Sequence, residues 1–180
     1  MFPDPPEIPS ETLEATDWSY DSERKTSSTK EVLGTFEFEV YTYSKKYEYE
    51  GDGGTGILFA NTTRTEPSPA DLPFGVGEDR VTSIVMSRGL KTLKDELRER
   101  GAHDITVEEE TKSETPTGEP LELERITATY ENETTSGWVG AARREEEFLT
   151  AGGVSTVENE PEKEGAMPDE EIRRLVESVV

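Results

Sequence analysis

Arg88-Gly-Leu-Lys-Thr-Leu-Lys-Asp-Glu-Leu-Arg-Glu-Arg100 is the stretch of sequence that decides the fold. Leu90, Leu93 and Leu97 recur at helical spacing and fall on one face, while nearly every other position is charged. Gly101 follows directly, and glycine is the residue that most often ends a helix. The stretch therefore predicts an amphipathic helix whose apolar face must be buried against another layer.

The segments on either side of this helix alternate apolar with polar residues, which is the pattern of strands with one buried face. Proline- and glycine-containing turns separate these segments, so the strands are expected to pair antiparallel. In two strands the apolar positions change parity: the change at Val40–Tyr41 predicts a β-bulge or a bend, and the change around Arg125 predicts a β-bulge. The predicted strands are Gly34–Glu50, Gly56–Thr65, His103–Lys112, Leu121–Glu131, Gly137–Arg144 and Phe148–Val157.

A second amphipathic helix is predicted at Asp169–Val180, where apolar residues again recur at helical spacing and acidic residues fill the first turn. Val81–Met86 is β-rich and predicts a short strand, whereas Asp21–Lys30 is polar and predicts a loop. Glu66–Asp79 contains three prolines and two glycines and predicts a long loop.

These elements predict an α+β fold: a mostly antiparallel sheet of about six to eight strands covered by the helices Arg88–Arg100 and Asp169–Val180. Residues 1–16 begin with four prolines among nine residues, so we expect an extended or disordered segment there. Residues 17–180 are expected to form a single domain.

The chain of 180 residues carries 41 acidic against 19 basic residues, a formal net charge of -22. Three interpretations compete: a salt-adapted surface, an acidic disordered protein, and a surface that binds cations or basic proteins. The acids are dispersed through periodic segments rather than held in one tail, which favours salt adaptation. Only 31% of the residues are hydrophobic, so the core is expected to be thin.

Composition also excludes several kinds of function. Binding to nucleic acid through phosphates needs clustered Lys and Arg, which this chain lacks. The sequence contains no cysteine, and this excludes disulfides, zinc–thiolate sites and cysteine nucleophiles. We expect no cofactor and no metal site. No segment approaches a membrane span and the first residues do not resemble a signal peptide, so we expect a cytoplasmic protein without membrane contact.

Several short motifs match functional patterns without their structural context. Gly51–Gly56 fits GxGxxG, but a strand pattern follows where a nucleotide fingerprint needs a helix, so we interpret it as a hairpin loop. His103 is the only histidine, and no GxSxG elbow accompanies it. Asn61 and Asn132 each begin a glycosylation sequon, which in a threonine-rich chain arises by chance.

The most specific binding hypothesis is an apolar pocket beneath the proline- and glycine-rich loop. Large apolar side chains with few polar partners are the usual lining of such sites. The alternative is that the same residues form ordinary core. The residues that would line the pocket are Phe36, Phe38, Leu72, Phe74, Tyr130 and Trp138.

Two resemblances follow from these patterns. The acidic, threonine-rich, cysteine-free composition resembles that of haloarchaeal proteins. The order of elements from Gly56 to Val180 is similar to that of the Mog1/PsbP-like α/β/α sandwich domains, on the segments Gly56–Ala60, Arg88–Arg100, Trp138–Gly140 and Asp169–Val180. This second resemblance implies a non-catalytic module that binds a protein or a small ligand, and it implies no functional residue.

Two classes of function therefore stay open. The first is a non-catalytic binding or interaction module of a salt-adapted cytoplasm, whose partner is a protein or a small apolar ligand. The second is a carboxylate-based hydrolase or another small enzyme that uses acidic residues with or without His103. Buried, unpaired carboxylates converging on one cavity would favour the second class. The sequence does not predict an oligomeric state.

Overall fold

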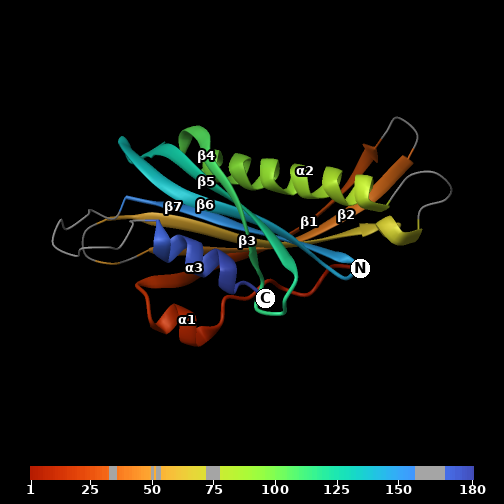
Figure 1. The fold of residues 1–180 in the computed structure, drawn as a ribbon, viewed down its shortest axis with the longest axis horizontal. Coiled ribbons are helices and arrows are strands. Elements are labelled where there is room, and N and C mark those ends of the chain that lie inside the picture. Colours follow the sequence, from red (N-terminus) through yellow and green to blue (C-terminus); the bar gives the residue numbers. More distant parts are fainter. Residues whose placement is uncertain (33–35, 50, 52–53, 72–77, 157–168) are drawn as a thin grey trace.

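The computed structural model describes all residues except 33–35, 50, 52–53, 72–77 and 157–168. Seven strands form one antiparallel sheet in the order β1-β2-β3-β7-β6-β5-β4 (Figure 1). The predicted α+β class and the mostly antiparallel sheet are confirmed. The strands are β1 (Trp18–Val32), β2 (Phe36–Tyr49), β3 (Gly56–Glu66), β4 (His103–Glu114), β5 (Pro120–Tyr130), β6 (Glu133–Arg144) and β7 (Glu147–Ser155).

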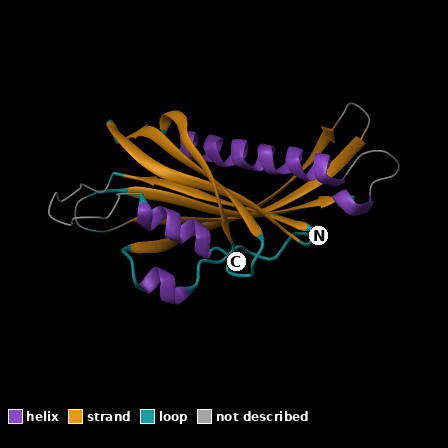
Figure 2. Cartoon of the chain, in the orientation of Figure 1, coloured by secondary structure: helices purple, strands orange, loops and turns teal. Residues whose placement is uncertain are grey.

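Each face of the sheet is covered by one of the two predicted helices (Figure 2). The longer helix, α2 (Glu78–Glu99), packs on β6 and β7 through Leu90, Leu93 and Leu97. The shorter helix, α3 (Glu170–Ser178), packs on the same two strands from the other side. A further short helix, α1 (Ser10–Glu14), and a 3-10 turn, η1 (Pro69–Asp71), lie at the margins.

Because helices cover both faces of the sheet, consecutive residues of its central strands are buried. Leu58 and Ala60 belong to the cluster beneath α3, whereas Ile57 and Phe59 belong to the cluster beneath α2. A strand exposes alternate side chains to opposite faces, so a central strand of a doubly covered sheet is apolar at every position. Alternation with one polar face is therefore the wrong template for β3 and β7, whose residues are almost all buried.

The β-bulge predicted in β2 at Val40–Tyr41 is wrong, because β2 pairs with β3 in continuous register from Glu39 to Tyr49. Around Arg125 a register shift does occur, in the pairing of β5 with β4, but the extra residue lies in β4 between Val107 and Glu109, and β5 pairs with β6 without a shift. The apolar positions change parity because each strand contributes to one face at one end and to the other face at the other end. In β5, Leu123 packs beneath α3, whereas Ile126 packs beneath α2.

The polar segment Asp21–Lys30, predicted to be a loop, is the middle of β1. It pairs with β2 along nearly its whole length, and its side chains are exposed at the edge of the sheet. Charged residues on an edge strand discourage pairing with other chains, so a polar sequence is compatible with this position. Lys46 is buried in β2 beside Asp21 and Glu48.

Val81–Met86, predicted to be a strand, is the first half of α2. Met86, Leu90, Leu93 and Leu97 are spaced as one continuous helical stripe, and Met86 packs against the cluster that the three leucines form with the sheet. The β-branched residues Val81, Ile84 and Val85 lower helix propensity only weakly, and packing of the stripe overrides it.

The N-terminal segment is more ordered than expected. Residues 1–9 carry no helix or strand, as predicted for an extended segment, but Ser10–Glu14 form α1. Ile8 is buried in the cluster beneath α3, and Glu7 pairs through both of its backbone groups with Val180. The segment is therefore held against the domain by one apolar side chain and by backbone hydrogen bonds that the prolines leave available.

Candidate functional site

The placement of α2 leaves part of the sheet uncovered. The helix lies over β6 and β7, whereas β1 and β2 extend beyond it at the edge of the sheet (Figure 1). Gly89 faces β7, where a Cβ atom would come within 2.8 Å of the Thr150 methyl group. The helix is therefore close to the sheet along β7 and open toward β1 and β2.

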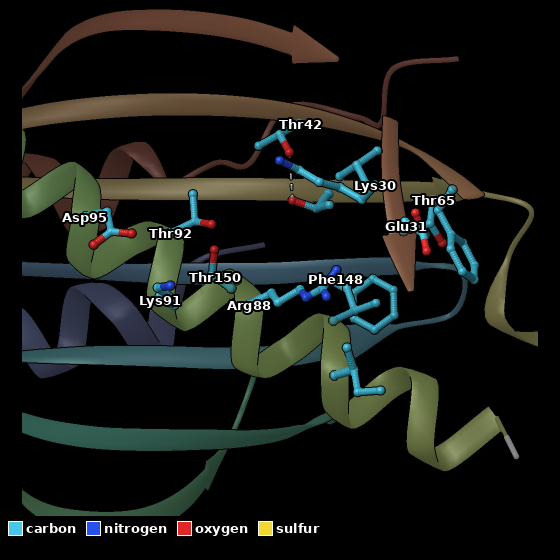
Figure 3. A pocket seen from close by; sticks show the side chains of 16 residues that line it. Lys30, Glu31, Thr42, Thr65, Arg88, Lys91, Thr92, Asp95, Phe148 and Thr150 are labelled. Carbon is cyan, nitrogen blue, oxygen red and sulfur yellow. Dashed lines mark hydrogen bonds between the residues drawn. The ribbon is translucent and has the colours of Figure 1, made fainter. Parts of the chain in front are cut away.

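A cavity of about 430 Å³ lies in this opening, between α2 and the face of the sheet that β1, β2, β3 and β7 present (Figure 3). Its volume is within the range of small-molecule sites. The strands contribute Lys30, Glu31, Phe38, Val40, Thr42, Thr63, Thr65, Phe148 and Thr150, and α2 contributes Ile84, Val85, Arg88, Gly89, Lys91, Thr92 and Asp95. We refer to this cavity as the α2 pocket.

The floor of the α2 pocket is apolar. Phe38 and Phe148 line this floor and are 3% and 2% exposed, so only a small part of each side chain is open to the cavity. Val40 from β2 and Ile84 and Val85 from α2 complete the apolar lining. Such a surface favours an apolar ligand, because each Å² of apolar surface removed from water contributes about 25 cal/mol to the free energy of binding.

Threonine hydroxyls interrupt this apolar lining. Thr42 and Thr63 share a hydrogen bond of 3.1 Å across β2 and β3, which satisfies both hydroxyls (Figure 3). Thr65, which is 2% exposed, has a buried hydroxyl oxygen without any hydrogen-bond partner in the part of the chain that the structure describes. A buried polar atom without a partner costs about 1–3 kcal/mol, so the Thr65 hydroxyl is an unfavourable element of the cavity wall.

Charged side chains surround the mouth of the α2 pocket. Lys30, Arg88 and Lys91 are exposed there, together with Glu31 and Asp95 (Figure 3). Asp95 accepts a hydrogen bond of 2.6 Å from Arg98, so its charge is already balanced. The mouth is therefore a basic area on a chain whose formal net charge is -22.

A smaller cavity of about 210 Å³ continues along the same face beneath the end of α2, and it is mainly polar. Glu96 is its most enclosed acid, with a side chain that is 12% exposed. Burial raises the pKa of the Glu96 carboxyl, and a hydrogen bond of 3.0 Å from the Asn61 amide and the nearby Arg24 guanidinium, 3.8 Å away, oppose that rise.

Asn61 lies between the two cavities. Along β3, Thr65 and Thr63 line the α2 pocket and Phe59 lines the smaller cavity, so the intervening inward residue is Asn61. Its hydrogen bond to Glu96 connects the strand to the helix at that point, and its own carbonyl oxygen has no partner among the described residues. The bond between Asn61 and Glu96 therefore separates an apolar compartment from a charged one.

The structure does not bring the six predicted pocket residues together. Phe38 lines the α2 pocket, but Tyr130 belongs to the core beneath α2 and Trp138 to the core beneath α3. Tyr130 and Trp138 thus lie on opposite faces of the sheet. Leu72 and Phe74 lie outside the described residues, and the side chain of Phe36 also lies outside them, although its backbone belongs to β2.

Sequence reasoning missed most of the α2 pocket because it assigned Val81–Met86 to a strand. Once these residues are helical, Ile84, Val85 and Arg88 share a face at i, i+1 and i+4. The threonines of β2 and β3 gave a second signal, since Thr42, Thr63 and Thr65 occupy inward positions where a closed core has larger apolar residues.

Neither a metal site nor a catalytic constellation emerges from the described residues. They contain no group of three or more His, Asp or Glu side chains placed to hold a metal ion. His103 is exposed at the start of β4, and its Nδ1 lies 3.1 Å from the Gly101 carbonyl oxygen. None of the helices in the described part of the chain is both long enough and apolar enough to cross a membrane.

The fold and the cavity together define a class: an α+β domain whose doubly covered antiparallel sheet retains a pocket beneath one helix. Residues 5–180 match the model of a family described as a domain of unknown function (DUF6517), and the chain belongs to that family. No curated protein and no solved structure matches the chain. The similarity to Mog1/PsbP-like domains and to haloarchaeal proteins stays a prediction.

Proposed function

We propose that this domain is a non-catalytic binding module whose α2 pocket takes a small, mainly apolar ligand. The observation that carries the proposal is the cavity of about 430 Å³ between α2 and the sheet, with an apolar floor and a buried, unpaired Thr65 hydroxyl. Binding pockets typically combine a mostly apolar lining with a few polar groups that orient the ligand. The α2 pocket has this composition, and its walls come from β1, β2, β3, β7 and α2.

The carboxylates of the described residues support binding over the enzyme alternative. Asp169 is 2% exposed and pairs at 2.6 Å with Arg125, and Glu124 pairs with Lys94. Glu96 is held by Asn61 and Arg24. A carboxylate-based hydrolase needs at least one acid free to exchange a proton or attack a substrate in a shared cavity. The partners of these three acids favour a structural role for them.

The experiment that tests the proposal is a calorimetric titration with three ten-carbon probes: decanol, decanoate and decylamine. At least one probe is expected to bind with a stoichiometry of one. Val40→Trp fills the cavity with an indole and should abolish this binding, because Val40 lines the α2 pocket. Tyr41→Trp is the matched control, since the next residue of β2 faces the opposite side of the sheet. Saturable binding that Val40→Trp leaves intact would contradict the proposal.

A salt-adapted cytoplasm is the second part of the proposal, and the net charge of -22 supports it. Self-repulsion among dispersed acids weakens as salt shortens the screening length from about 10 Å at 0.1 M to about 3 Å at 1 M. The melting temperature should therefore rise from dilute buffer to molar KCl. A melting temperature that is flat or falling over this range would refute salt adaptation.

A further inference from the structure

Within the part of the chain that the structure describes, the basic residues at the mouth of the α2 pocket have no acidic partner, which is unexpected in so acidic a chain. Among the described residues, Lys30, Arg88 and Lys91 form no ion pair and no hydrogen bond. The sequence has 41 acidic against 19 basic residues, so a randomly placed cation would usually find a carboxylate. Three cations left unpaired around one cavity are a specific feature of its surface.

Other basic residues of the same region show the contrast. Arg24 pairs with Glu96 and Lys94 with Glu124, both across the gap between elements. Arg98, on α2 beside the pocket, pairs with Asp95 at 2.6 Å. Four other cations without an ion-pair partner in the described part of the chain are dispersed over β1, the two ends of α2 and β4: Lys25, Arg80, Arg100 and Lys112. The Lys25 ammonium group lies over the rings of Phe2 and Tyr43 instead.

The charges and the cavity have complementary chemistry. Phe38 and Phe148 form an apolar floor, and Arg88 and Lys91 stand on the helix that forms the opposite wall. A ligand with an apolar tail and an anionic head can bury its tail on the floor and place its head at the mouth. A neutral ligand would leave the three cations unpaired, and a cationic ligand would be repelled by them.

From this arrangement we infer the ligand class of the α2 pocket: a single-chain amphiphile with an anionic head, whose tail lies on Phe38 and Phe148 and whose head is held by Lys30, Arg88 and Lys91. The inference rests on the proposed binding function and makes it more specific. The inference predicts a preference for anionic ligands, whereas the formal net charge of -22 makes the protein as a whole attract cations at long range. Preference for an anion therefore reports on the local cations alone.

The test compares the dissociation constants of decanoate, decanol and decylamine for the full chain in molar KCl, where long-range forces are screened. Decanoate should bind about tenfold more tightly than either of the others, the effect expected for charge-assisted contacts at a partly exposed mouth. In the double variant Arg88→Gln/Lys91→Gln this advantage of decanoate should disappear, while decanol should bind as before.

The matched control is the double variant Lys112→Gln/Arg174→Gln, which removes the same charge from β4 and from α3 on the other face. It should keep the preference for decanoate. Binding of decylamine or decanol as tight as that of decanoate would overturn the anionic ligand class and leave the binding function standing. If none of the three probes binds, the proposed function itself fails, and the inference fails with it.

Discussion

The two faces of the sheet are covered by helices of very different length, and the shorter helix closes its face more completely. α3 has 9 residues and α2 has 22. Beneath α3 the described residues form a continuous core that extends from Leu121 in β5 to Trp18 in β1. Beneath α2 the core ends at β3, and a cavity of about 430 Å³ follows. Helix length alone therefore does not determine how well a sheet face is filled.

The α3 face is completed by the N-terminal segment and by aromatic residues. Ile8 is buried there, and the Trp18 indole donates a hydrogen bond of 2.9 Å to Glu171 at the start of α3. Arg173 lies 5.0 Å above the ring of Trp138, which links the helix to β6. Segments distant in sequence thus fill the space that a short helix leaves.

The α2 face has no equivalent filling among the described residues. The α3 face has Trp18 on β1 and Tyr47 on β2, whereas the α2 face has Thr42 on β2 and Thr63 and Thr65 on β3. Threonine is too small to reach across to α2, and its hydroxyl keeps the surface partly polar. The comparison teaches that the pocket arises from small inward side chains rather than from a displaced helix.

The largest effect on stability is expected from removing a leucine side chain from the core beneath α2 or from the core beneath α3. Comparing the two substitutions tests whether the two helices are packed equally tightly on the sheet. Leu93 in α2 is 0% exposed and Leu175 in α3 is 1% exposed. Substituting either with alanine should lower the free energy of unfolding by about 2–5 kcal/mol, because a buried leucine loses its transfer energy and leaves a cavity. Denaturant titration in molar KCl measures both.

The exposed neighbour Thr92 provides the control, since Thr92→Ala should change the free energy of unfolding by less than about 0.5 kcal/mol. A cost below about 1 kcal/mol for Leu93→Ala would show that α2 is not packed on the sheet as described. The α2 pocket would then lose one of its walls.

A smaller effect on the free energy of unfolding is expected from substituting the threonines that line the α2 face of the sheet. The buried hydroxyl of Thr65 has no partner among the described residues, so Thr65→Val should raise the free energy of unfolding of the ligand-free protein by about 1 kcal/mol. Thr42→Val should instead lower it by about 1 kcal/mol, because it removes the partner of Thr63. If Thr65→Val destabilises the ligand-free protein as much as Thr42→Val does, the hydroxyl is already satisfied there.

The smallest expected effect is a change in the pH dependence of stability on substituting Glu96, the enclosed acid of the neighbouring cavity. Burial raises its pKa in the folded protein, so ionisation of Glu96 opposes folding above that pKa, and the penalty disappears as pH falls below the ordinary carboxyl value of 4.5. Glu96→Gln should therefore be more stable than the parent chain at neutral pH and lose this advantage at acidic pH.

The exposed Glu99→Gln removes the same charge from the same helix and corrects for general repulsion. Thermal unfolding across this pH range should separate the two variants. Equal pH profiles for Glu96→Gln and Glu99→Gln would show that the Glu96 carboxyl is not specifically affected by its surroundings.

Much of the fold could be predicted from local patterns. The leucine stripe of α2 and the stripe of α3 follow from periodicity, because each helix buries residues at regular spacing. The strands from β3 onward follow from apolar segments bounded by turn residues. The turn between β5 and β6 is at Glu131–Asn132, both with positive φ, whereas Glu131 is the last residue of the predicted strand Leu121–Glu131, and β6 begins at Glu133, earlier than the predicted Gly137. The predictions that failed concern segments whose structure depends on contacts with other elements rather than on their own residue pattern.

β1 illustrates the limit, since its polar residues become a strand only through pairing with β2. The candidate site shows the same limit more strongly. Phe38 is the single predicted pocket residue that lines the α2 pocket among those the structure describes, because aromatic residues mark a core as readily as a site. Which face each aromatic occupies depends on strand register, and register is not visible in composition or spacing alone.

The most direct test of the central claim, that the unfilled part of the α2 face is a binding site, is a map of amide NMR shifts during titration with decanoate in molar KCl. The largest shifts should saturate together and fall on Phe38–Thr42, Thr63–Thr65 and Ile84–Thr92, the segments that line the α2 pocket. Shifts that do not saturate, or that are largest beneath α3, would contradict the claim.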